Sequence, residues 1–235
     1  MNLVIDSGNT RIKAGLFERR NLLAAKTFKR NELKLLNEFI VAKKPKQSIV
    51  SDVTGKLTLR EIKAENVCFL TEKTQLPVKL QYHPVKNLGK DRICSIVAAD
   101  FLFPDSPVLI IDCGTALKMD LVAKKKFLGG SIAPGMQMRF ESLHRFTAAL
   151  PLIKPKPEFD VLGNSTKGSI LSGVQFGMIS EMENRISLHR REFRNLKVLL
   201  TGGDWLWFVN HLKYSIFAAP ELTLIGLNEI LLFQK

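Results

Sequence analysis

The sequence predicts an α/β protein made of two related halves, and three observations support this prediction. Apolar runs of strand length alternate in blocks with segments of helical period along the 235 residues. An apolar pair followed by Asp, a small residue and Gly occurs at Asp6 and again at Asp112, about half the chain apart. That repeat is too long for a solenoid unit, so it indicates two domains, 1–105 and 106–235, facing each other across a cleft.

The first half begins with a predicted β-hairpin. The apolar run Asn2–Ile5 stops at the polar tip Ser7–Asn9, and apolar residues then alternate with polar or small ones at the strand period, at Ile12, Ala14 and Leu16. A third strand is expected at Leu22–Phe28. Asn31 is the expected cap of the helix that follows.

The second half repeats this order, with a buried strand at Val108–Ile111, a tight turn at Cys113–Thr115 and an alternating strand beyond it. Lys197–Thr201 is a further expected strand. Helical patterns are expected at Asp91–Leu102, at Met136–Thr147, at Thr166–His189 behind the cap Ser165, at Asp204–Leu212 and at Leu222–Leu232.

The net charge of +13 suits an anionic partner, whether a nucleotide, a nucleic acid or a membrane surface. The basic residues are dispersed and lack the interleaved aromatic residues of a single-strand binding platform, which favours a solvated surface. No basic leader or long apolar segment is present, so a cytoplasmic location is expected. Cys68, Cys94 and Cys113 are expected to be reduced core thiols, and the four histidines have no metal-ligand spacing.

The repeated turn has the chemistry of a phosphate site. Glycine lets backbone N–H groups approach phosphate oxygens, hydroxyl groups donate further hydrogen bonds, and a carboxylate at a strand end holds a hydrated cation. Lys13 is close enough in sequence to reach a transferred phosphoryl group. One copy of the turn has an equally good purely structural explanation, and the second copy favours the phosphate site.

A third glycine turn, Thr201–Gly203, follows an apolar strand and opens a helix. Trp205 and Trp207 come next, and they either flank an adenine or pack an amphipathic helix. Packing is the favoured interpretation.

Five motifs occur in order over nearly the whole chain: Asp6-x-Gly-Asn-Thr-x-x-Lys13, Gly89-x-Asp-Arg92, Asp112-x-Gly-Thr-Ala116, Gly129-Gly-x-Ile-x-Pro-Gly135 and Thr201-Gly-Gly203. This ordered set resembles the type III pantothenate kinases. The resemblance implies duplicated ribonuclease H-like domains of the actin-like class, with mixed sheets flanked by helices. It also implies a homodimer that transfers the ATP γ-phosphate to pantothenate, the first step of coenzyme A biosynthesis, with Mg²⁺ and a monovalent cation, K⁺ or NH₄⁺.

The same resemblance assigns the ligands of ATP and of the cations. Asp6 would lie near Mg²⁺, and Asp112 would coordinate the monovalent cation. The residues implied to bind ATP and its phosphates are Asp6, Ser7, Gly8, Asn9, Thr10, Arg11, Ile12, Lys13 and Thr115.

The resemblance also assigns the pantothenate site. Asp91 would be the general base for the substrate hydroxyl, and Arg92 would pair with the pantothenate carboxylate. The residues implied to bind the substrate are Gly89, Lys90, Asp91, Arg92, Thr166 and Tyr82. Taken alone, Asp91 is better explained as a carboxylate at a helix N-terminus, and Thr166 is equally well explained as an ordinary first-turn residue.

The sequence departs from the family after Ala116, where Leu117 and Lys118 replace the usual hydroxyl residues. The Lys118 ammonium either weakens the need for a monovalent cation or points outward from the strand. Two other functions stay open: a nucleic-acid-binding or transcriptional accessory protein on the same scaffold, and an actin-like kinase with another small acceptor.

Overall fold

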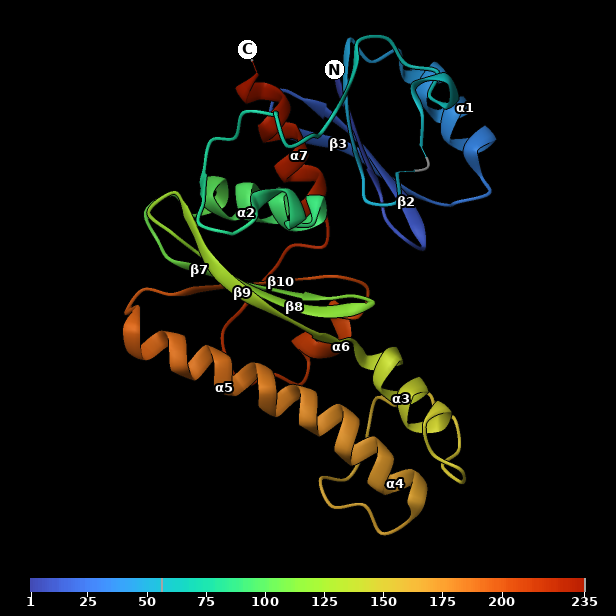
Figure 1. The fold of residues 1–235 in the computed structure, drawn as a ribbon, viewed down its shortest axis with the longest axis vertical. Helices are drawn as coiled ribbons and strands as arrows, with labels where there is room; N and C mark the ends of the chain where they lie inside the picture. Colours follow the sequence, from blue (N-terminus) through green and yellow to red (C-terminus); the bar gives the residue numbers. More distant parts are fainter. Residues whose placement is uncertain (56, 235) are drawn as a thin grey trace. The chain divides into compact units, whose positions relative to one another are not determined.

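A computed structural model describes residues 1–55 and 57–234 (Figure 1). The chain groups into two compact units. Unit 1 comprises Met1–Pro104, Ala123–Leu128 and Glu221–Lys235, and unit 2 comprises Asp105–Val122 and Gly129–Pro220. The division into independent domains 1–105 and 106–235 stays a prediction.

Unit 1 contains a mixed five-stranded sheet in the order β3-β2-β1-β4-β5. Neighbouring strands are antiparallel from β3 to β1, whereas β4 and β5 run parallel to β1. The predicted hairpin and third strand are confirmed. The strands are β1 (Asn2–Ser7), β2 (Arg11–Glu18), β3 (Asn21–Lys29), β4 (Gln47–Asp52) and β5 (Val67–Phe69).

Helices cover both faces of this sheet. Leu3 and Ile5 of β1 form a buried cluster with residues of α1 (Leu33–Lys43), whereas Val4 points to the opposite face, where α7 (Leu222–Phe233) packs. Helix α2 (Lys90–Leu102) packs against α7, and two 3₁₀ turns complete the unit, at Leu59–Glu61 and Val85–Asn87. The predicted Asn31 cap is wrong: Glu32 is the N-cap residue of α1, and its side chain instead accepts a hydrogen bond from the Lys29 N–H.

The second sheet, most of whose strands belong to unit 2, has the order β11-β10-β7-β8-β9-β6. Strand β7 is antiparallel to β8 and parallel to β10, which is parallel to β11. The run β9-β8-β7-β10-β11 therefore repeats the strand order of unit 1, so the sequence repeat corresponds to a structural one. The strands are β6 (Lys79–Leu80), β7 (Val108–Cys113), β8 (Ala116–Ala123), β9 (Lys126–Pro134), β10 (Lys197–Thr201) and β11 (Phe217–Ala218).

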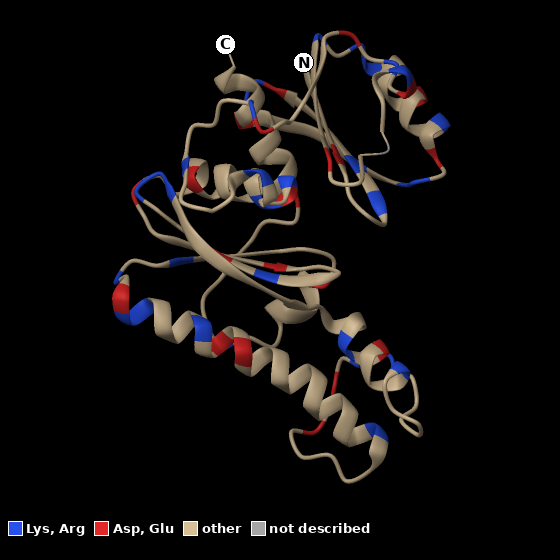
Figure 2. Cartoon of the chain, in the orientation of Figure 1, with Lys and Arg blue, Asp and Glu red and all other residues tan. Residues whose placement is uncertain are grey.

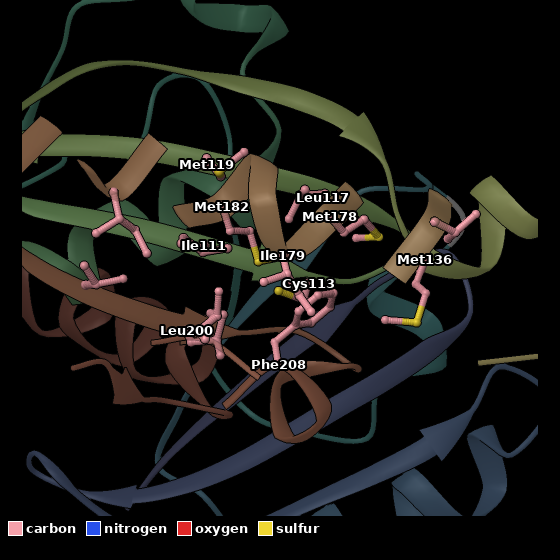
Figure 3. Packing of buried hydrophobic residues seen from close by; sticks show 14 of the residues in the cluster. Ile111, Cys113, Leu117, Met119, Met136, Met178, Ile179, Met182, Leu200 and Phe208 are labelled. Carbon is pink, nitrogen blue, oxygen red and sulfur yellow. The ribbon is translucent and has the colours of Figure 1, made fainter. Parts of the chain in front are cut away.

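The core of unit 2 lies between this sheet and its helices (Figure 3). Ile111, Leu117 and Leu200 from the strands pack with Met182 of α5 and Phe208 of α6. The helices are α3 (Met136–Arg145), α4 (Thr166–Leu171), α5 (Gly177–Glu192) and α6 (Trp205–Val209).

The long helix predicted at Thr166–His189 is confirmed, with a π-helical segment, Ser172–Phe176, joining α4 to α5. Ser165 caps it by accepting a hydrogen bond from the Gly168 N–H at 3.1 Å, as predicted. This cap satisfies one of the backbone donors that a helix start leaves without a partner.

Two of the three cysteines are core thiols as predicted, but Cys68 is not. Cys94 and Cys113 are buried, whereas Cys68 lies exposed on the edge strand β5. A three-residue edge strand does not cover its own outward-facing side chains, which is why the apolar neighbours of Cys68 misled the prediction. Within residues 1–55 and 57–234, no helix is long and apolar enough to cross a membrane.

Candidate active site

The tip of the β1–β2 hairpin in unit 1 exposes polar groups, while the strand residues on either side of the tip are buried. The Gly8 N–H donates to the Arg11 carbonyl at 3.0 Å and closes the turn. Asn9, Thr10 and Arg11 are exposed, whereas Ser7 and Ile12 are buried. Because the Ile12 side chain belongs to the core, only its backbone is available to a ligand.

Asp6, at the end of β1, carries an unsatisfied carboxylate oxygen. Its Oδ1 atom is buried and has no hydrogen-bond partner within the described part of the chain. Burial, followed by the negative charge of Asp91, raises the pKa of Asp6 to about 6, and Ser51, Lys13 and Thr223 offset only part of that rise. A lone carboxylate oxygen beside a second carboxylate suits a divalent cation with oxygen ligands.

Asp91 lies in the first turn of α2. Burial raises the pKa of both Asp6 and the Cys94 thiol, and the negative charge of Asp91 adds to both rises. The Asp91 Oδ1 accepts a hydrogen bond from the Arg92 N–H at 2.9 Å, so the helix-terminal role considered from the sequence is present. A Cβ at position 89 would lie 2.6 Å from that oxygen, which explains the glycine there. The Lys90 Nζ donates to the Asp52 carbonyl at 3.0 Å.

Arg92 lies beside two neighbouring aromatic rings, whose centroids are 6.0 Å apart. It is 5% exposed, and its guanidinium carbon lies 5.5 Å from the ring centroids of both Tyr82 and Phe127. The rings stabilise the guanidinium by cation–π attraction. A guanidinium is a planar fork of N–H donors, the geometry that matches a carboxylate. The structure thus brings Tyr82 and Arg92 together, as their assignment to one substrate required.

Two contributors to the unit 1 site were missed from the sequence, Arg30 and Asp52. Arg30 donates to the Gly8 carbonyl and, at 2.8 Å, to Thr54 Oγ1, so it ties the hairpin tip to the turn after β4. Asp52 accepts hydrogen bonds from the Thr54 and Leu57 N–H groups, which outweigh the effect of burial and lower its pKa. Its signal in the sequence was weak: the apolar pair Ile49-Val50, then Ser51 and an aspartate before a glycine-containing turn.

In unit 2, the equivalent hairpin holds an ion pair. Lys118 Nζ lies 2.7 Å from Asp112 Oδ2, and both side chains are largely buried. The outward orientation considered for Lys118 is therefore wrong. The two residues are direct cross-strand partners in the β7–β8 ladder, which places both side chains on one face of the sheet.

Three turns of unit 2 meet beside this ion pair. The Asp204 N–H donates to the Cys113 carbonyl at 2.9 Å, and the Gly135 N–H donates to the Thr115 carbonyl at 3.0 Å. Gly202, with φ of 97°, lies against Cys113. The Thr115 side chain is exposed at the tip of the hairpin. The second and third glycine turns are thus in direct contact within unit 2.

The remaining sequence-based candidates lie on helices of unit 2. Trp207 stacks on His211 with ring centroids 3.8 Å apart, and its indole N–H donates to the Lys156 carbonyl at 3.0 Å, so the packing interpretation holds. Thr166 is the exposed first residue of α4, on a different segment from the Asp112 turn. Within the described residues, no group of three or more His, Cys, Asp or Glu side chains could hold a metal ion.

A family model described as type III pantothenate kinase matches residues 2–187 of the chain. The chain belongs to the type III pantothenate kinase family. It is 40% identical to the type III pantothenate kinase of Christiangramia forsetii, over 100% of this chain and 99% of that protein. It is 41% identical to the type III pantothenate kinase of Cytophaga hutchinsonii, over 98% of each chain. This type III pantothenate kinase uses ATP to phosphorylate pantothenate in coenzyme A biosynthesis.

Solved structures place this type III pantothenate kinase in the actin-like ATPase fold. A Campylobacter jejuni protein named for the Baf family of transcriptional activators aligns with a TM-score of 0.63 and 20% identity, over 99% of this chain and 98% of that one. Component A of the (R)-2-hydroxyglutaryl-CoA dehydratase of Acidaminococcus fermentans aligns with a TM-score of 0.53 and 15% identity, over 99% and 96% of the two chains. At these identities the likeness concerns the fold alone, and it agrees with the two mixed sheets described above.

Proposed function

We propose that Asp91 is the general base of this pantothenate kinase and that Asp6 binds the Mg²⁺ ion that accompanies ATP. The observation that supports both roles is the electrostatic coupling of these two carboxylates in unit 1. Asp6 offers a buried oxygen without a hydrogen-bond partner in the described chain, as a cation ligand requires. Asp91 is only half-buried and lies next to Arg92 in the sequence. It is therefore accessible to the hydroxyl of a pantothenate molecule whose carboxylate is bound by the Arg92 guanidinium.

The proposal assigns phosphate-binding groups to the hairpin tip of each unit, each considered within its own unit. In unit 1 these are the residues from Ser7 to Lys13, with Ile12 contributing its backbone alone. In unit 2 the contact is the exposed hydroxyl of Thr115. Mg²⁺ would supply charge neutralisation at the β- and γ-phosphates, which is the main requirement of phosphoryl transfer.

For pantothenate, the proposal places the carboxylate against Arg92, with Tyr82, Gly89 and Lys90 around it. A buried guanidinium packed against two rings is a preorganised partner for a carboxylate, because little side-chain freedom remains to be lost on binding. Thr166 is proposed as a further contact, with pantothenate that is bound to a second copy of the chain.

The proposal includes a homodimer and a cytoplasmic location. Large apolar side chains on unit 2 are exposed, among them Leu162 at 89% and Phe146 at 80%, and a second copy would cover such surface. Three reduced cysteines accord with a reducing compartment. Light scattering of the purified protein tests the dimer, and a monomer at micromolar concentration would contradict it.

The family resemblance also implies a monovalent cation at Asp112. We do not place K⁺ or NH₄⁺ there, because the Lys118 ammonium already neutralises that carboxylate. Nucleic-acid binding is not part of the proposal either, because lysine and arginine are scattered over both units among acidic residues instead of forming one band (Figure 2).

The test is ADP release from the purified protein with ATP and Mg²⁺, with and without pantothenate. The expected result is pantothenate-dependent turnover that falls about 10²- to 10⁴-fold in Asp91→Asn, with unchanged circular dichroism. Asp105→Asn, on the loop after α2, is the matched carboxylate control and should keep wild-type turnover. Full activity in Asp91→Asn would remove the proposed base, and ATP turnover without pantothenate dependence would point to another acceptor.

A further inference from the structure

We propose that Lys118 is a built-in cation of the ATP site, so that this kinase binds ATP and turns over without K⁺ or NH₄⁺. The proposal rests on the function proposed above and deepens it. Lys118 acts through Asp112 and is therefore a positioning residue.

Backbone register fixes the position of the lysine. Asp112 and Lys118 are direct partners in the antiparallel β7–β8 ladder, on the strands that the turn at Gly114 connects. Their side chains share one face of the sheet, and Nζ reaches Oδ2 at 2.7 Å. With side-chain exposures of 15% for lysine and 16% for aspartate, water screens this pair only partly.

The equivalent pair in unit 1 behaves differently. Asp6 and Lys13 are also direct cross-strand partners at the end of a hairpin. There, however, Lys13 Nζ lies 3.8 Å from Glu221, and Asp6 Oδ1 has no hydrogen-bond partner in the described chain. In unit 1 one Asp6 oxygen thus stays without a hydrogen bond, as an external divalent cation requires, whereas in unit 2 Lys118 is in direct contact with Asp112.

A lysine ammonium carries the single positive charge that K⁺ or NH₄⁺ would bring to this carboxylate. It is covalently held, so no translational freedom is lost when it occupies the position. A second cation at Asp112 would be repelled by the ammonium already in contact with it. The residues present therefore do not fit an additional monovalent cation.

The location of the pair explains why a cation is needed there. The Asp112 carboxylate lies at the base of the turn that presents the exposed Thr115 hydroxyl, and the Gly202 turn packs against it. An unneutralised carboxylate beside a proposed phosphate contact would repel the anionic phosphates. Lys118 removes that repulsion and leaves the Thr115 tip suitable for an anion.

The test compares wild-type protein with Lys118→Thr, which replaces the ammonium by a hydroxyl. ATP affinity by calorimetry and pantothenate-dependent ADP release are measured in tetramethylammonium buffer of constant ionic strength, with and without KCl or NH₄Cl. Wild-type values are expected to change less than about twofold, whereas Lys118→Thr should lose roughly tenfold or more without K⁺ and recover with K⁺ or NH₄⁺ but not Li⁺. Thallium NMR with Tl⁺ as a potassium probe should detect binding to Lys118→Thr and none to the wild type.

Lys126→Thr is the matched control, because Lys126 is an exposed lysine at the start of β9 in the same sheet. It should behave as the wild type under every salt condition. Loss of wild-type turnover or ATP affinity in K⁺-free buffer, or Tl⁺ binding to the wild type, would overturn the proposal even if Lys118→Thr fails to fold. Absence of pantothenate-dependent turnover in every buffer would instead contradict the proposed function, and the ATP and Tl⁺ measurements would still decide the role of Lys118.

Discussion

Gly202 lies so close to Cys113 that no side chain fits between them. A Cβ on Gly202 would be 2.4 Å from the Cys113 carbonyl carbon and 2.6 Å from Asp112 Oδ1. The φ of 97° adds a backbone conformation that side-chain-bearing residues rarely adopt. The third glycine turn is thereby held directly against the second one within unit 2.

Gly202→Ala is therefore expected to destabilise the protein by about 2–4 kcal/mol, because strain and a clash with backbone atoms act together. Gly203→Ala is the matched control, since a Cβ there meets nothing within 4 Å. Urea unfolding measures both variants. Equal stability of the two would show that the Cys113 turn moves aside without penalty.

A second close approach joins the helices α2 and α7 in unit 1. A Cβ on Gly226 would lie 1.8 Å from the Cys94 carbonyl oxygen, so the two helix backbones touch at this point. Gly226→Ala must push the helices apart and is expected to lower the free energy of unfolding by about 2–4 kcal/mol. Because α2 also carries Asp91, we expect turnover to fall as well.

The control for this helix pair is Gly177→Ala at the start of α5, where a Cβ meets nothing within 4 Å. It should be neutral or stabilise by up to about 1 kcal/mol through helix propensity. Thermal unfolding separates the two variants, and a stable, fully active Gly226→Ala protein would contradict the close packing.

The pair of Arg20 and Glu229 anchors the C-terminal helix to the first sheet. The Arg20 Nε and one terminal nitrogen each lie 3.1 Å from a Glu229 oxygen, and the guanidinium also lies 4.9 Å from the Phe101 ring centroid. Glu229 is 9% exposed and Arg20 is 62% exposed. A double-mutant cycle of Arg20→Gln and Glu229→Gln should give a coupling of about 1–2 kcal/mol. A coupling near zero would mean that solvent screens the pair fully.

Asp6 should make stability fall as pH rises in metal-free buffer. Its pKa is about 6 in the folded protein against 3.8 as a reference, so the folded state holds the proton more tightly between these values. Stability is therefore lost as pH rises from about 4 to about 6, and the penalty persists at higher pH. Asp6→Asn should match the wild type at low pH and exceed its Tm by about 2–6 °C at pH 7.

The stability prediction for Asp6 is checked by thermal unfolding of both proteins across that pH range. Addition of Mg²⁺ and ATP should raise the Tm of the wild type more than that of Asp6→Asn, because only the carboxylate is a good cation ligand. A pH-independent difference in Tm would contradict the buried, coupled carboxylate.

The periodicity of the sequence predicted the strands of the first hairpin, the strands at Val108 and Lys197 and the main helices. It missed the longer strands β4 and β9 as well as the short edge strands. The hairpin at Asp6, the strand before Asp112 and the long helix behind Ser165 all follow from local patterns, because strand alternation and helix caps involve residues near in the chain. Strands of two or three residues, such as β6 and β11, are too short to show a recognisable alternation of apolar and polar residues. They exist because a neighbouring strand offers backbone partners.

The sequence alone determined the fold class, the internal repeat and the chemistry of the glycine turns, because these depend on residue type and local order. Only the tertiary structure decided where the charges pair. Asp6 and Asp112 look equivalent in sequence, and each has a lysine across the hairpin. Lys13 lies 3.8 Å from Glu221 and also offsets part of the rise in the pKa of Asp6, whereas Lys118 is in direct contact with Asp112. Such choices depend on residues brought together from distant parts of the chain, whose separation no local pattern encodes.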